Sequence, residues 1–187
     1  MSPIIRNWLA FAAIGTALIH LALVVSSPLA VGIVLAIIGL AELVWGVAMM
    51  ASGRLLLPRV ALAGAVVPII LWSAVLLVAV ESDATVVSSL RFLPLSLAAV
   101  LEIFVAGAIA IHIRRSFVAD SSRDASDARP ADVATNPPAG RYLLGLLVGS
   151  IAVASLTTPA LAATQAGDYA VPHGEHSVFQ FEEGHGH

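Results

Sequence analysis

The stretch LAVGIVLAIIGLAELVWGVAMM, residues 29–50, decides the fold, because it is long and apolar enough to cross a membrane. A membrane-spanning helix needs about 20 mostly apolar residues. Glycine recurs every seven residues in the stretch, at Gly32, Gly39 and Gly46, and Glu42 is its only ionisable residue. Positions three and four residues apart share a helix face. Glu42 therefore lies on the glycine face, where a second helix can approach closely.

The composition of the whole chain predicts an integral membrane protein of the all-α class. Of its 187 residues, 59% are hydrophobic and 11% are charged, whereas soluble domains carry about 25% charged residues. The absence of cysteine excludes disulfides, thiolate metal sites and cysteine nucleophiles. We expect a polytopic helical bundle with five transmembrane helices. The predicted spans are residues 8–25, 29–50, 60–80, 92–113 and 142–163.

These spans divide the chain into four predicted regions. Residues 1–115 form a four-helix transmembrane bundle, in which SSP, residues 26–28, makes a tight turn between the first two spans. Residues 116–141 are rich in Asp, Ser, Ala and Pro without an apolar period, which is typical of a flexible linker. Residues 142–163 form the fifth helix, and residues 164–187 form a tail rich in His and Glu.

The fifth span allows two interpretations. Gly145 and Gly149 form a GxxxG motif, which favours an uncut helix that packs against another helix. Ala160, Leu161 and Ala162 resemble a signal-peptide cleavage site, and a cut after Ala162 would release the tail. We favour the uncut helix.

The arginines predict the orientation, because Lys and Arg near the ends of spans stay in the cytoplasm. In a five-span topology only Arg91 lies on the opposite side from the other arginines. The N-terminus and the linker are therefore expected in the cytoplasm, and the C-terminal tail outside. The arginines on the cytoplasmic side are Arg6, Arg54, Arg59, Arg114, Arg115, Arg123, Arg129 and Arg141.

Three ionisable residues fall inside the spans on faces of small residues: Glu42, Glu102 and His20. A rise of about 1.5 Å per residue puts Glu102 near the midplane, Glu42 slightly deeper and His20 nearer the outer face. Charged groups at such depths usually pair, protonate or mark a pathway. The small residues on the other two faces are Ala98, Ala106 and Ala110 around Glu102, and Ala13, Thr16 and Ala17 before His20.

Three interpretations of these residues remain open. In the structural one, both acids are protonated and hydrogen-bond to Thr16, Ser73 or the carbonyl of Gly64, which Pro68 leaves free. In the functional one, the three residues form an intramembrane relay for protons or a metal-ion site. In the third, their partner belongs to another subunit. A haem is not expected, because His20 and His112 lie at opposite depths.

The end of the chain, GDYAVPHGEHSVFQFEEGHGH, predicts an external metal site. His173, His176, His185 and His187 lie close together in sequence with Glu175. Imidazole suits copper, zinc and nickel, and short His-rich tracts are a compositional sign of metal binding. We therefore expect copper or zinc at this tail. The alternative is a solvated low-complexity tail that binds metal only incidentally.

Four motifs, ALIHLAL, GLAELVWG, IILW and AVLEIFVAG, carry a resemblance over residues 8–113. With His20, Trp45, Trp72 and Glu102, they resemble a group of small multi-pass membrane proteins common in actinobacteria. Members of that group often have an amide at the position of Glu42 and more polar residues where this chain has VVSSP. Some have histidine-ended tails similar to AVPHGEH. The resemblance implies a protein of the bacterial plasma membrane.

Together these features predict a protein that binds or handles a transition metal, copper first, at the outer face of the membrane. The alternatives are a non-catalytic accessory subunit of a larger membrane complex and a proton-coupled small transporter. The sequence contains no nucleophile–base pair, phosphate loop or nucleotide motif, so we do not expect an enzyme. The expected partners are the lipid bilayer and other membrane subunits. Nucleic acid is not expected, because the arginines form no basic patch.

Overall fold

The computed structural model describes residues 1–82, 92–123 and 138–170, and every regular element within them is a helix. The expected all-α class is confirmed. The helices are α1 (Pro3–Val24), α2 (Leu29–Ser52), α3 (Pro58–Ser82), α5 (Phe92–Arg123), α6 (Ala139–Ala162) and the short α7 (Gln165–Asp168).

Four of these helices are long and apolar enough to cross a membrane, counted over the described residues: α1, α2, α5 and α6. In α3 the apolar part found by the same criterion, Pro58–Ala74, is shorter than a span. The third predicted span, residues 60–80, lies within a helix, α3. The predicted turn at residues 26–28 is confirmed, and there Ser27 Oγ donates to the carbonyl of Leu23 at 2.7 Å.

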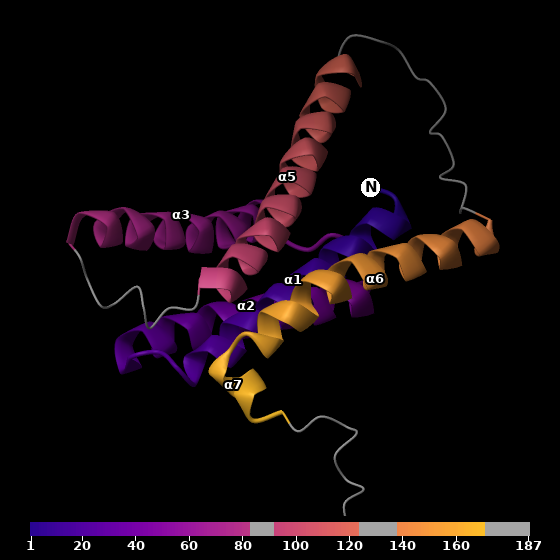
Figure 1. The fold of residues 1–187 in the computed structure, drawn as a ribbon. Coiled ribbons are helices and arrows are strands. Elements are labelled where there is room, and N and C mark those ends of the chain that lie inside the picture. Colours follow the sequence, from indigo (N-terminus) through magenta and orange to yellow (C-terminus); the bar gives the residue numbers. More distant parts are fainter. Residues whose placement is uncertain (83–91, 124–137, 171–187) are drawn as a thin grey trace, which may run out of the picture.

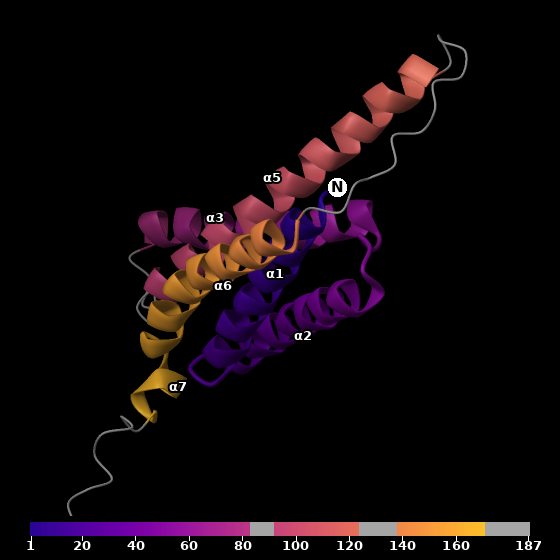
Figure 2. The same cartoon turned by 90° about the vertical axis from the view of Figure 1, so that its right-hand side faces the viewer.

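Helix α1 is the centre of the bundle, in contact with α2, α5 and α6. Its buried residues include Leu9, Ala13, Ile19 and Leu23. Figures 1 and 2 both show α6 running in the same direction as α1, while α2 and α5 run in the opposite direction. Helix α3 contacts mainly α5, and it projects away from the other helices in Figure 1.

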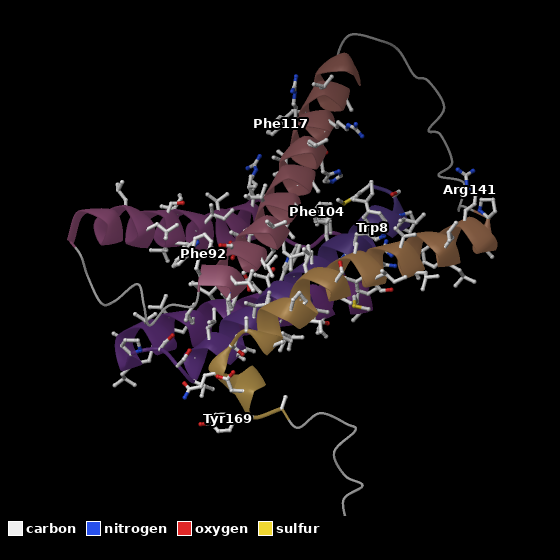
Figure 3. The ribbon with its side chains drawn as sticks, viewed as in Figure 1. Trp8, Phe92, Phe104, Phe117, Arg141 and Tyr169 are labelled. Atoms are coloured by element: carbon white, nitrogen blue, oxygen red, sulfur yellow. The ribbon has the colours of Figure 1, made fainter. Side chains whose placement is uncertain are left out.

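Helix α6 packs on α1 through the two glycines of the GxxxG motif. A Cβ at Gly145 would lie 3.0 Å from Ile4 Cδ1, and one at Gly149 would overlap the indole of Trp8. Trp8 Nε1 donates to the carbonyl of Gly145 at 2.7 Å. Figure 3 shows Trp8 and Arg141 toward the same end of the bundle. The expectation that this glycine pair forms a packing face therefore agrees with the structure, and its partner is α1.

Two expected boundaries differ from the structure. Helix α5 continues to Arg123, so residues 116–123, expected in the flexible linker, are helical. The reason is local, since neither glycine nor proline occurs between Gly107 and Pro130 to end the helix. Phe117 lies on this extended part of α5 (Figure 3). The guanidinium of Arg59 lies over its ring, 5.8 Å from the centroid.

The other difference is at the start of the expected tail. Residues 165–168 form α7, which contacts α6 and α1. Thr164, which is fully buried, accepts a hydrogen bond from the N–H of Gly167 at 3.2 Å and so caps this turn. The histidines predicted to bind metal in the tail lie in residues 171–187, outside the described residues.

Candidate metal centre

The glycine face of α2 brings Glu42 against α1, as the heptad spacing predicts. Gly32, Gly39 and Gly46 are all buried. A Cβ at Gly39 would lie 3.1 Å from the carbonyl oxygen of Ala17 and 3.2 Å from Cβ of His20. The two backbones can approach this closely only because glycine lacks that atom. Glu42, one turn after Gly39, therefore reaches the side chain of His20.

Three side chains from three helices meet at this point: His20 of α1, Glu42 of α2 and Glu102 of α5. A hydrogen bond of 3.0 Å joins His20 Nδ1 to Glu42 Oε2. His20 Nε2 lies 3.6 Å from Glu102 Oε1. One ligand atom from each residue lies within 4.8 Å of the other two, a grouping of the kind that holds a metal ion. We call these residues the His–Glu–Glu triad.

The side chains of the triad are largely shielded from solvent. The side chains of His20, Glu42 and Glu102 are 3%, 14% and 4% exposed. Glu102 Oε1 has no hydrogen-bond partner among the described residues. A buried oxygen without a partner is unfavourable, and a ligand between it and His20 Nε2 would satisfy it.

The structure corrects the depths expected for these residues. His20 is expected nearer the outer face than the two acids, but the ends of the three side chains meet within 4.8 Å of one another. The reason is the stagger of the hairpin, in which Gly32 of α2 already packs beside Val24 of α1. Gly39 is therefore level with His20, and the Glu42 side chain spans the remaining distance.

The structure shows where the two hydroxyl groups of the structural interpretation donate. Thr16 Oγ1 donates to the carbonyl of Ala12 at 3.0 Å, and Ser73 Oγ donates to that of Ile69 at 2.8 Å. Both hydroxyls thus donate within their own helices, and the His20 side chain contacts both acids.

The predicted small-residue face of α5 agrees with the structure only in its first half. Ala98 is buried with Glu102, but Ala106 is half-buried and Ala110 is exposed. A helix has 3.6 residues per turn, so a strict four-residue repeat drifts off the buried face. The residues that continue the contact are Leu101, Val105 and Ile109, all buried.

A cavity of about 300 Å³, which the sequence did not reveal, adjoins the triad between α1, α2, α3 and α5. Glu42, Glu102 and Thr16 line it together with apolar residues. Trp45, three residues after Glu42, lines it too, and its Nε1 donates to the carbonyl of Leu56 at 2.9 Å. The i, i+3 spacing from Glu42 was the available sign that Trp45 belongs to this face.

His112 lies apart from the His–Glu–Glu triad. It lines a second hollow together with Pro58, Arg59 and Phe117, toward the far part of α5. Of the histidines within the described residues, His20 is the one that meets the two acids.

Four of the described helices are long and apolar enough to cross a membrane, which is typical of a membrane protein, and three ionisable side chains gather between the helices. Comparison with protein-family models, curated proteins and solved structures gave no match.

Proposed function

We propose that this protein is a bacterial plasma-membrane protein that binds a divalent transition-metal ion at the His–Glu–Glu triad. The observation that carries the proposal is the meeting of one imidazole and two carboxylates within 4.8 Å, on three different helices. Three donors from separate helices can enclose an ion. A bound ion would also satisfy Glu102 Oε1, which has no hydrogen-bond partner among the described residues.

The distances suggest a division of roles within the triad. Two ligands about 2.0–2.1 Å from a tetrahedral zinc ion lie about 3.3 Å apart, close to the 3.6 Å between His20 Nε2 and Glu102 Oε1. A histidine that binds metal usually gives its other ring N–H to a carboxylate, which fixes the ring. The hydrogen bond from His20 Nδ1 to Glu42 fits that role. Glu102 and His20 would then hold the ion, with Glu42 orienting the ring or adding a third ligand.

The donor set favours particular metals. Imidazole suits zinc, copper, iron and nickel, whereas carboxylates suit manganese, calcium and magnesium. One imidazole with two carboxylates therefore fits zinc, iron(II) or manganese(II), while the imidazoles of His173, His176, His185 and His187 suit copper, nickel or zinc. Zinc is the ion that both sets accept. In this proposal the tail captures the ion outside and the triad holds it within the membrane.

The proposed topology has five spans, with the N-terminus in the cytoplasm and the tail outside. The directions of the helices support it, since α2 and α5 both run opposite to α1. A chain that crosses twice in one direction has to return between the two crossings, and α3 is the element between them. Arg59 beside Phe117 supports a common end for the start of α3 and the end of α5.

Zinc binding to the full-length chain in mild detergent tests the proposal, with His173, His176, His185 and His187 replaced by alanine so that the tail does not contribute. Titration calorimetry should give one site per chain. His20→Ala and Glu102→Gln should abolish binding. Glu42→Gln should weaken it by about 10–100-fold, as loss of an orienting partner does.

His112→Ala is the matched control, because it removes a histidine from another hollow of the same chain. It should leave zinc binding unchanged. Equal zinc binding by the His20→Ala and His112→Ala proteins, both folded, would overturn the proposal and leave the proton relay as the role to test.

A further inference from the structure

The cavity beside the triad opens at the surface between α2 and α3, on the side of the bundle that would face lipid in a membrane. Ile37 of α2 and Val60 and Val67 of α3 line it, and these side chains are 64%, 65% and 47% exposed. A cavity lined by exposed side chains of two helices has its mouth at the surface between them. In a membrane such a mouth meets hydrocarbon, so a molecule dissolved in the bilayer can enter without crossing water.

The side chains that line the cavity are mostly apolar, and the charged types among them are all acidic. Apart from the carboxyl groups of Glu42 and Glu102 and the hydroxyl of Thr16, the side chains that line it are apolar or, at Trp45, aromatic. None of the described lining residues is basic. Glu102 lines the cavity with its side chain 4% exposed and with Oε1 unpartnered among the described residues. The cavity therefore offers an apolar chamber with the carboxyl groups of Glu42 and Glu102 at its inner end.

We propose that this cavity binds a singly charged organic cation with an apolar body, which enters from the bilayer and pairs with Glu42 and Glu102. The apolar body is matched by the aliphatic lining, and the positive charge by the carboxylates. Trp45 adds an aromatic face of the kind that attracts alkylammonium groups. A volume of about 300 Å³ is at the small end of ligand pockets, which fits a cation with one ring rather than a large drug.

Gly64 gives a way to close this cavity without touching the triad. It lines the cavity, and a Cβ built on it meets no atom within 4 Å. The Gly64→Leu side chain would therefore extend into empty space and occupy the chamber. Gly107 of α5 has the same open surroundings but does not line the cavity. Gly107→Leu is thus the matched control for the added bulk.

The test uses the full-length chain in detergent, with the tail histidines replaced as in the zinc experiment, and tritiated benzyltrimethylammonium as the probe. This probe keeps its charge at every pH. Neopentylbenzene, in which carbon replaces the ammonium nitrogen, is its neutral isostere. The cation should bind saturably, and the isostere should not displace it. Gly64→Leu, Glu42→Gln and Glu102→Gln should each raise the dissociation constant by about tenfold or more, and Gly107→Leu should leave it unchanged.

Two results would overturn the inference. Displacement by neopentylbenzene as effective as by unlabelled cation would show an apolar chamber for lipid chains, without charge recognition. Unchanged binding in Gly64→Leu would place the cation elsewhere. The outcome is separable from that of the metal proposal, because Gly64→Leu should still bind zinc while His20→Ala should not.

Discussion

Replacement of Gly149 by alanine tests the packing of α6 on α1, and the structure sets its magnitude. The new Cβ would overlap the indole of Trp8, which is a rigid ring held by its hydrogen bond to Gly145. Overpacking of this kind destabilises by about 1–3 kcal/mol. Displacing the ring also breaks a hydrogen bond worth about 1 kcal/mol. Alanine regains about 1 kcal/mol as a better helix former than glycine. Gly149→Ala should therefore lower the free energy of unfolding by about 1–3 kcal/mol.

Gly145→Ala is the matched control from the same motif. Its Cβ would come to 3.0 Å from the side chain of Ile4, a tight contact without the overlap found at Gly149, so the gain in helix propensity should offset the contact and leave stability within about 1 kcal/mol. Unfolding in mixed detergent micelles, followed by circular dichroism, measures both. In a Trp8→Ala background, Gly149→Ala should lose its penalty, because the ring is gone. Equal effects of the two glycine substitutions, or a penalty that persists without Trp8, would refute the reasoning.

Three further predictions concern the triad, the tail and the topology. Glu42→Leu leaves the buried His20 without its partner and should destabilise by about 1–3 kcal/mol, whereas Glu42→Gln keeps a hydrogen-bonding shape and should unfold near the unchanged protein; equal loss in both would contradict this. A synthetic peptide of residues 167–187 should bind copper(II) or zinc(II) at neutral pH and release it below about pH 6 as histidines protonate; an alanine-for-histidine peptide that binds equally well would leave only the low-complexity interpretation. A reporter fused after His187 should be active only in its periplasmic form, and cytoplasmic activity would reverse the topology.

The helices could be predicted from the sequence because each depends on local information. A run of apolar residues fixes a membrane helix within a few residues, and Ser26 to Pro28 fix a turn. The end of α5 could not be placed in the same way. Composition alone indicated a linker after residue 115, but residues 116–123 contain neither glycine nor proline and continue the helix to Arg123.

The candidate site could be predicted in part. The glycine repeat put Glu42 on a packing face, and the small neighbours of His20 did the same, so their meeting follows from spacing within each helix. The level at which they meet depends on the stagger between α1 and α2, which no single helix encodes. The cavity was out of reach for the same reason, since it is a space between four helices and depends on how far α3 stands from α2.

Charge balance connects the two proposed occupants of the site. Two ionised carboxylates in a hydrocarbon setting are unfavourable unless positive charge is close to them. A divalent ion held by Glu102 and neutral His20, with Glu42 at 3.0 Å from the ring, brings the sum of charges to zero. A singly charged organic cation balances one of the two carboxylates, whereas the divalent ion balances both. Each occupant uses the same negative charge, so zinc at saturation should weaken binding of the organic cation. A chain that placed Glu42 alone in its apolar stretch would have no such balance. The acid is tolerated because α1 brings the imidazole of His20 to within 3.0 Å of it.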